Sequence, residues 1–194
     1  MILPIVGYGD AVLKTPAKAI PPDFPELKKL IADMYETMYY AHGVGLAAPQ
    51  IGKSIRLFVV DSAPMEDDDD EKGKKTIKPG LKKAFINPTM LSEEGEAWGF
   101  QEGCLSIPGV REQVYRKPVI TLQYYDEDWN LHKQKFEGMT ARVIQHEYDH
   151  LEGILFTDHL SPLKKRLIKA RLTKITKGDV DTDYRMKFSA VKGR

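Results

Sequence analysis

Apolar residues recur at helical spacing in three stretches of the chain. The first covers residues 26–41, where Asp23 can cap the helix and Pro25 suits its first turn. The second covers residues 140–151, and the third begins after Ser161 and runs to about residue 177. A glycine follows each stretch within a few positions, as is common just after a helix C-terminus. Three helices are therefore predicted, and the last of them is basic and amphipathic.

Strands are predicted where short β-branched or alternating runs lie between these helices. Such runs cover residues 55–60, 83–87, 114–125 and 131–136. They do not alternate regularly with helices, as the strands of a doubly wound parallel sheet would. The pattern therefore favours an α+β fold.

Composition and length limit the chain to one ordinary domain. It has 194 residues, of which 42% are hydrophobic and 29% are charged. We expect residues 1–178 to form this domain and residues 179–194 to be a loosely held polar tail. The block at 66–75, acidic through residue 71 and then basic, carries too many like charges to pack. It is therefore expected to be a solvated loop inserted between two strands.

Charge and cysteine content exclude several kinds of partner and compartment. The formal net charge of +1 supplies no global field that would hold DNA or an anionic membrane. No apolar run approaches the roughly 20 residues of a spanning helix, and the N-terminus lacks a basic leader. The single cysteine, Cys104, cannot form an internal disulfide, which favours a reducing compartment. We therefore expect a cytoplasmic protein.

One pentapeptide, His146-Glu-Tyr-Asp-His150, carries the sharpest chemical signal in the chain. On a helix, His146 and His150 lie on one face, so both imidazoles can point at one metal ion. Glu147 lies within the same narrow arc and can take a proton from metal-bound water. This arrangement is typical of metal-assisted hydrolysis. The simpler alternative is that both histidines are surface residues on a charged helix face.

A catalytic metal site needs a third protein ligand. One zinc-peptidase pattern has Gly153 at the right place, but Phe156 stands where its third histidine should be. His159 is available beyond the helix end, although nothing in the pattern supports it. Cys104 remains, in a compact segment rich in small residues that let a ligand approach the backbone. We interpret Cys104 as a thiolate ligand rather than as a nucleophile or a buried hydrophobe.

The segment Gly43-Val-Gly-Leu-Ala-Ala-Pro-Gln50 lacks the lysine and spacing of a phosphate-binding loop. Its small residues would let an extended peptide lie against exposed backbone. Gln50 offers an uncharged amide donor, which is one kind of group that stabilises an oxyanion. Without the metal motif, the same segment would be interpreted as a tight loop.

Taken together, three segments resemble the peptide deformylase family. They are residues 43–50, Glu102-Gly-Cys-Leu-Ser106 and Gln145-His-Glu-Tyr-Asp-His-Leu-Glu-Gly153, in the family's order. The similarity extends from the N-terminus through the third helix. The resemblance implies antiparallel sheets around the helix that carries the two histidines. It also implies removal of the N-terminal formyl group from formyl-methionyl nascent polypeptides, with release of formate.

The resemblance also assigns roles to residues of this chain. As metal ligands it implies Cys104, His146 and His150. As catalytic groups it implies Glu147, the general base and acid, together with Gln50 and the backbone N–H of Leu105, which stabilise the oxyanion. As substrate-binding residues it implies Val44, Gly45, Gly103, Arg111 and Ile144. As a pair supporting the metal ligands it implies Glu102 and Arg116.

The resemblance further implies one divalent metal ion. Ferrous iron is the usual physiological metal of the family, whereas zinc, nickel or cobalt could occupy a purified protein. Spacing alone does not decide between them, because a thiolate and two imidazoles suit several metals. In some related deformylases the C-terminal helix docks near the ribosomal exit, which makes the basic helix at 162–177 a candidate ribosome contact. A solvated basic face is the simpler explanation.

Other functions remain open at this level. A zinc endopeptidase is favoured by the pentapeptide and opposed by Phe156. A general acyl or peptide hydrolase would use the same metal ligands. A non-catalytic binding module would instead hold a structural metal in a closed site with four ligands. Under these candidate functions, the protein differs in whether it would cleave internal peptide bonds, distinguish formyl from larger acyl groups, or keep water on the metal.

Overall fold

The computed structural model describes residues 1–63 and 80–189. The charged insertion predicted at 66–75 lies outside the described residues. The fold is a mixed α/β arrangement of antiparallel sheets and three α-helices, as the sequence predicts. Within the described residues, no helix is long and apolar enough to cross a membrane.

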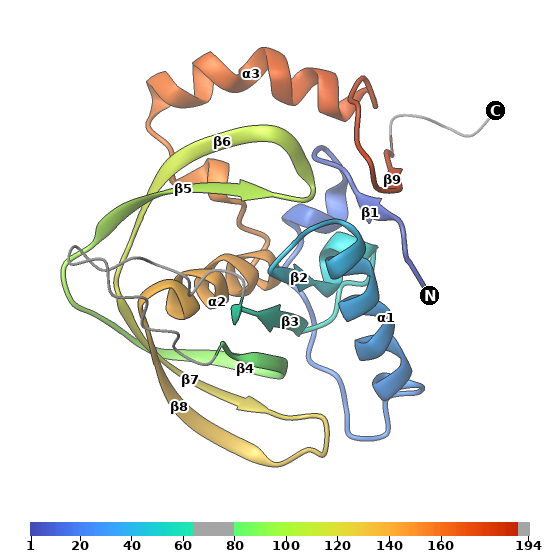
Figure 1. The fold of residues 1–194 in the computed structure, drawn as a ribbon, viewed down its shortest axis with the longest axis vertical. Helices are drawn as coiled ribbons and strands as arrows, with labels where there is room; N and C mark the ends of the chain where they lie inside the picture. The colour runs from blue at the N-terminus through green and yellow to red at the C-terminus, as the bar shows by residue number, and fades with distance from the viewer. Residues whose placement is uncertain (64–79, 190–194) are drawn as a thin grey trace.

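The main sheet has five strands in the order β2-β3-β4-β7-β8, and all of its pairings are antiparallel. Its strands are β2 (Gly45–Ala47), β3 (Leu57–Asp61), β4 (Lys82–Glu94), β7 (Val119–Tyr125) and β8 (Leu131–Glu137). A separate two-stranded ribbon is formed by β5 (Trp98–Cys104) and β6 (Ile107–Arg116). Figure 1 shows this ribbon on the opposite side of the central helix from β4, β7 and β8.

That central helix is α2 (Gly138–Leu151), which is enclosed between the main sheet and the ribbon (Figure 1). Its apolar side chains, such as Ile144 and Leu151, pack with Phe58 and Phe85 of the sheet. Burying such apolar surface is the main favourable term in folding. The helix nevertheless also buries Glu147 and His150. Charged and polar side chains are rarely buried without a partner or a function, so this helix is where chemistry is expected.

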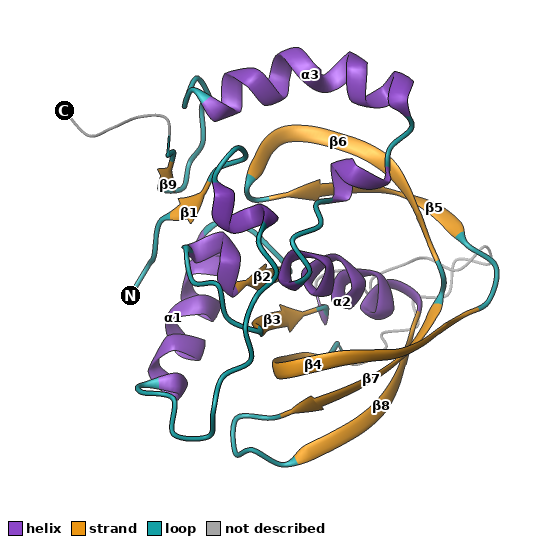
Figure 2. Ribbon diagram, turned by 180° about the vertical axis from the view of Figure 1, so that it is seen from behind, coloured by secondary structure: helices purple, strands orange, loops and turns teal. Residues whose placement is uncertain are grey.

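The other helices flank this core. Helix α1 (Leu27–Tyr40) packs its apolar side chains against the N-terminal strands of the main sheet. Helix α3 (Pro162–Thr176) lies along the ribbon (Figure 2). Ser161 caps α3, as predicted, by accepting a hydrogen bond from the Lys164 N–H. The predicted cap of α1 is wrong: Glu26 is the N-cap residue, and no side chain bonds the helix end.

Several predicted strand bounds also change. The run at 114–125 is not one strand, because β6 ends at Arg116 and β7 begins at Val119. Pro118 lies between them and has no N–H to contribute to a sheet. The strand expected at 83–87 is the first part of the longer β4. Residues 45–47, for which no strand was predicted, form strand β2. The 3-10 turn η2 (Ala48–Ile51) follows it and carries Gln50.

The tail is not loosely held where the structure describes it. Strand β9 (Met186–Lys187) pairs in parallel with β1 (Ile5–Val6), and the two lie side by side in Figures 1 and 2. The N–H groups of Ile5 and Gly7 donate to carbonyls of Arg185 and Lys187, each at 2.9 Å. The polar composition of the tail concealed this pairing, because the bonds are made by backbone groups.

Candidate metal centre

Three side chains from two distant parts of the chain meet at the centre of the molecule. The ligand atoms of Cys104, His146 and His150 lie within 4.8 Å of one another. The Cys104 sulfur is 3.3 Å from Nε2 of His150, and the two imidazole rings are 5.2 Å apart. One sulfur and two imidazole nitrogens form a donor set that suits zinc, iron and related divalent ions. The residues present therefore fit the metal that the sequence implied.

Local geometry explains how each ligand reaches this position. His146 and His150 are four residues apart on α2, so their side chains lie one turn apart on the same helix face. Cys104 is the last residue of β5, where the pairing with β6 becomes irregular after Gly103. Such an irregularity re-aims a side chain at a strand end. The hairpin thereby turns the sulfur toward the helix.

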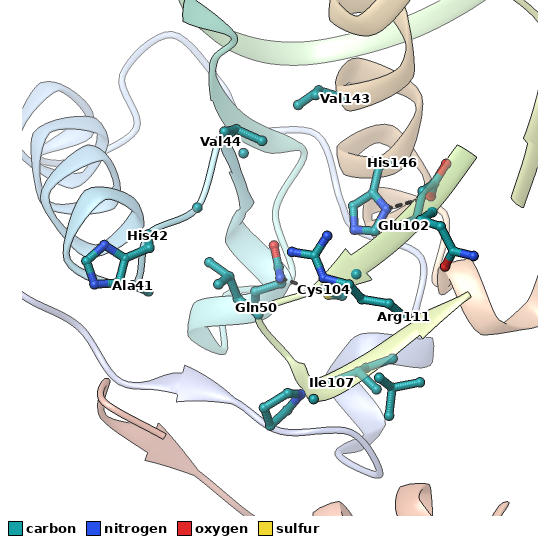
Figure 3. Close-up of a pocket in the computed structure, with 18 of the residues that line it drawn as sticks. Ala41, His42, Val44, Gln50, Glu102, Cys104, Ile107, Arg111, Val143 and His146 are labelled. Carbon is teal, nitrogen blue, oxygen red and sulfur yellow. Dashed lines mark hydrogen bonds and ion pairs between the residues drawn. The ribbon is translucent and has the colours of Figure 1, made fainter. Parts of the chain in front are cut away.

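The Glu102 carboxylate contacts His146 at the ring nitrogen that points away from the cluster. It accepts bonds from Arg116 at 2.7 and 3.0 Å, and from Arg142 at 2.8 Å. Its Oε2 is also 3.0 Å from Nδ1 of His146, as Figure 3 shows, which leaves Nε2 of that ring to face the centre. Burial alone would raise the pKa of Glu102, but the bonds from His146 and Arg116 hold it well below its usual range. Glu102 is thus a carboxylate that orients His146.

A second link joins this group to the end of η4 (Phe156–His159). Arg116 also bonds Asp149 at 2.7 Å, and Asp149 is 2.8 Å from Nε2 of His159. His159 was one alternative for the third metal ligand. The structure instead pairs it with Asp149, and the residue grouped with the two histidines is Cys104. Phe156 stacks on the ring of His146 with centroids 6.1 Å apart.

Glu147 is buried beside the two histidines without being part of their ligand set. Burial raises its pKa to about 7, and the nearby charges of His146 and Arg116, which favour the charged form, do not cancel this effect. Among the described residues its Oε2 atom is buried with no hydrogen-bond partner. A carboxylate with a free acceptor atom and a pKa near neutrality is suited to accept and return a proton.

The side-chain amide of Gln50, in η2, reaches the Cys104 sulfur of the cluster. Its Oε1 accepts a bond from the Ala47 N–H at 2.8 Å, which fixes which end of the amide faces inward. Its Nε2 then points at the Cys104 sulfur, 3.4 Å away (Figure 3). The same nitrogen is 3.3 Å from Oγ of Ser106. A donor held in place before substrate arrives can stabilise negative charge that develops beside it.

These groups open into one pocket of about 1050 Å³. Of the residues predicted to bind substrate, Val44, Gly45, Gly103 and Arg111 line it, and so does Leu105. Ile144 does not: it is fully buried in the core beneath the sheet. The neighbouring Val143 lines the pocket instead, on the same side as Val44 (Figure 3). One residue along a helix turns a side chain by about 100°, so Val143 borders the pocket from the edge of the same core cluster while Ile144 does not.

Sequence reasoning missed several other lining residues. They are Phe100, Met139 and Arg142 near Val143, and Asp181, Thr182, Asp183 and Tyr184 of the tail. On α2, Met139 lies four residues before Val143 and Arg142 lies four residues before His146, so helical spacing could have found them. For the tail no local signal exists, because its position depends on pairing with β1.

Comparison with known proteins gives a consistent result. The sequence model of the polypeptide deformylase family matches residues 2–166. A peptide deformylase from Flavobacterium johnsoniae is 59% identical over 194 residues, covering 99% of this chain and 98% of that protein. One from Christiangramia forsetii is 55% identical over 193 residues, with 99% and 98% covered.

Solved structures agree. The crystal structure of a peptide deformylase from Legionella pneumophila has a TM-score of 0.76 and 37% identity, covering 92% of this chain and 98% of that one. A peptide deformylase from Ehrlichia chaffeensis, solved in complex with actinonin, has a TM-score of 0.77 and 32% identity. That match covers 93% of this chain and 99% of the other.

Proposed function

Because the chain belongs to the peptide deformylase family, we propose how its own residues remove a formyl group. The protein is a metal-dependent hydrolase that takes the N-terminal formyl group from formyl-methionyl polypeptides and releases formate. The proposals below concern which residues perform this reaction, which metal serves it and where in the cell it acts.

We propose that Cys104, His146 and His150 hold one divalent ion. When bound, the ion supplies Lewis acidity and lowers the pKa of its water. The support is the cluster of one sulfur and two nitrogens within 4.8 Å, with Glu102 orienting one of the rings. Three protein ligands also leave a coordination position open, which a closed structural site would not.

We propose ferrous iron as the physiological metal. Thiolate and imidazole donors accept iron as well as zinc, nickel and cobalt, so the donor set permits this choice without dictating it. Metal analysis of protein purified without oxygen, paired with a formate-release assay on the same sample, tests it. Iron-loaded protein should be the most active form and should lose activity in air as iron or the Cys104 thiolate is oxidised. Full activity in an air-stable zinc form would contradict the proposal.

We propose that Glu147 moves the proton in the reaction. Its carboxylate takes a proton from the water that attacks the formyl carbon and then delivers it to the departing amine. The raised pKa and the unpartnered Oε2 support this role. Gln50 and the N–H of Leu105 are placed beside the Cys104 sulfur and would donate to the oxygen on which negative charge develops.

We propose that the substrate lies along the pocket with its backbone beside Gly45 and Gly103. Neither glycine has a side chain to block an extended peptide. Val44, Val143 and Met139 would surround the methionine side chain, and Arg111 would lie beside the residues that follow. An apolar slot suits the flexible, polarizable thioether of methionine. Actinonin, the ligand of the Ehrlichia chaffeensis relative, is therefore a suitable competitive probe of this pocket.

The observation that carries the assignment is the buried carboxylate of Glu147, whose Oε2 has no hydrogen-bond partner within the described part of the chain, beside the Cys104–His146–His150 cluster. Glu147→Ala should keep its metal content while formate release falls by at least ~100-fold. The exposed Glu137, at the start of α2, provides a matched control, and Glu137→Ala should retain normal turnover. Near-normal turnover in Glu147→Ala would eliminate the proposed proton-transfer role.

We also propose that the protein works in the cytoplasm and contacts the ribosome through α3. Leu163 and Leu167 are 65% and 72% exposed on this helix, next to the exposed basic residues Arg166 and Lys169. Ile168 and Leu172 on the other face are buried, so truncation of the helix would disturb the core.

Charge reversal is therefore the cleaner experiment. R166E/K169E should abolish salt-sensitive co-sedimentation with ribosomes while leaving formate release from a free peptide unchanged. Equal co-sedimentation of both proteins at every salt concentration would contradict the ribosome contact. Recovery of the enzyme outside the cytoplasmic fraction of its cells would contradict the localisation.

A further inference from the structure

The C-terminal tail forms part of the wall of the active-site pocket. Asp181, Thr182, Asp183 and Tyr184 line it together with residues of the three site segments. The family sequence model ends at residue 166, so this wall lies beyond the part of the chain that it describes. One residue of the tail, Tyr184, hydrogen-bonds the turn that carries Cys104.

Tyr184 holds the turn that carries two of the proposed active groups. Its hydroxyl donates to the backbone carbonyl of Leu105 at 2.8 Å. Leu105 follows the metal-binding Cys104, and its own N–H is one of the proposed oxyanion donors. Two further bonds hold the same turn: the Tyr8 N–H donates to the Ser106 carbonyl at 2.8 Å, and Gln50 reaches the Ser106 hydroxyl.

Tyr184 is itself well anchored, so it can transmit this constraint. The residues after it pair with β1, and the ring of Phe188 covers Gly7 so closely that a β-carbon at position 7 would collide with it. Just before it, the Thr182 hydroxyl donates to the Tyr184 carbonyl at 2.9 Å. Burial raises the pKa of Tyr184, so the phenol keeps the proton that it donates.

We propose that Tyr184 is a positioning residue for deformylation, which rests on the function proposed above. Its bond to the Leu105 carbonyl limits rotation of the turn between β5 and β6. The sulfur of Cys104 and the N–H of Leu105 are thereby kept at the distances that the developing oxyanion needs. Small displacements of such preorganised groups are costly to the reaction rate, even when the displaced residues make no covalent step. Tyr184 touches neither substrate nor metal in this role.

The test replaces only the hydroxyl. In Tyr184→Phe the ring and its packing remain, while the bond to Leu105 is lost. We expect kcat and kcat/KM for a formyl-methionyl peptide to fall together by roughly 3- to 10-fold, with KM within about twofold of normal. The matched control is Tyr115→Phe, which removes a hydroxyl from a ring that is 63% exposed on the ribbon. This control should match the original protein in every measurement.

A second measurement reports on the turn without using catalysis. Both variants and the original protein are loaded with Co(II), and the near-ultraviolet charge-transfer absorption that arises from the thiolate bond to cobalt is recorded. We expect the band to shift in Tyr184→Phe and to stay unchanged in Tyr115→Phe, because only the former releases the turn that carries Cys104.

Three results would overturn the inference. They are an unchanged kcat and cobalt band in Tyr184→Phe, a rise in KM alone, or a fall in melting temperature alone. A rise in KM alone would assign Tyr184 to substrate binding, and a fall in melting temperature alone would make it merely structural. None of these results affects the proposed proton transfer, which the Glu147 variant tests separately. Conversely, an active Glu147→Ala protein would leave the cobalt measurement on Tyr184 meaningful.

Discussion

The carboxyl group of Glu147 lies directly against the backbone of Gly45. A β-carbon built at position 45 would stand 2.7 Å from the carboxyl carbon, closer than such atoms approach in proteins. Gly45 is in β2 and Glu147 is on α2, so the contact joins the edge of the main sheet to the central helix. The absence of a side chain at position 45 is therefore what allows the proposed base to occupy its place.

This contact predicts the effect of a single added methyl group. Gly45→Ala should displace the Glu147 carboxylate and lower kcat by at least ~10-fold, because proton transfer depends on its position. Metal content should remain normal, since none of the atoms proposed to bind the metal lies at the collision. Metal analysis and formate release on the same sample check both statements.

Gly138→Ala serves as the control for that substitution. Gly138 has φ +61°, and a β-carbon there meets no atom within 4 Å. The cost should be backbone strain of about 1–2 kcal/mol in unfolding free energy, with kcat unchanged. If Gly45→Ala behaved in the same way, the packing of Gly45 on Glu147 would have no bearing on catalysis.

Removal of the thiol should separate metal binding from folding. In Cys104→Ala the two histidines remain, but the sulfur that stands 3.3 Å from His150 is lost. We expect metal affinity to fall by at least ~100-fold, because two imidazoles alone make a weak site. Zinc titration of protein from which metal has been removed by a chelator, followed by calorimetry, measures the change in affinity. A fully metallated, active Cys104→Ala protein would remove Cys104 from the ligand set.

The buried carboxylate of Glu102 predicts how stability depends on pH in the chelated protein. Its pKa is below the usual value in the folded state, so the stability it contributes is present above about pH 4.5, the unfolded value. That contribution is lost as the pH falls further. At pH 7, Glu102→Gln should unfold with about 3–5 kcal/mol less free energy than the original protein.

The difference between these two proteins should shrink below pH 4.5, because only the original protein gains a proton at position 102 on unfolding. Chemical denaturation at pH 7, 5 and 3.5 measures it. A difference that stayed constant over this range would mean that Glu102 contributes through packing and not through its charge.

Two adjacent helix residues should respond in opposite ways. Ile144→Ala removes a fully buried side chain and should cost about 2–5 kcal/mol of stability, while KM for a formyl-methionyl peptide stays normal. Val143→Phe adds bulk to the pocket wall and should raise KM by several-fold. Melting curves and steady-state kinetics distinguish the two. A raised KM in Ile144→Ala would restore that residue to the substrate pocket.

The size of the pocket at the metal should also decide which acyl group is removed. A formyl group is small, and the space beside the sulfur is bounded by Gln50 and Glu147. We expect formyl-methionyl peptides to react at least ~100-fold faster than acetyl-methionyl peptides of the same sequence, since the extra methyl would displace these groups. Equal rates would identify a general acyl hydrolase.

Local spacing in the sequence determined the elements that carry the chemistry. Residues 146–150 place both imidazoles on one face whenever they form a helix, and apolar spacing and glycine stops gave all three helices within a few residues. Elimination of other candidates pointed to Cys104 as the third ligand and the amide of Gln50 as an oxyanion donor, while likeness to a known family strengthened both and added the role of Leu105. These features depend on residues that are close along the chain, or on short sequence motifs.

Tertiary structure decided what depends on contacts between distant segments. The approach of Cys104 to His150, the space at Gly45 for Glu147 and the reach of Tyr184 to Leu105 each join residues more than 40 positions apart. Val143 rather than Ile144 lines the pocket because of how α2 is rotated about its axis against the sheet. Helical spacing alone fixes that rotation only to within about one residue. Strand pairing and helix rotation are set by the free energy of the whole folded chain. They therefore do not follow from any single segment of the sequence.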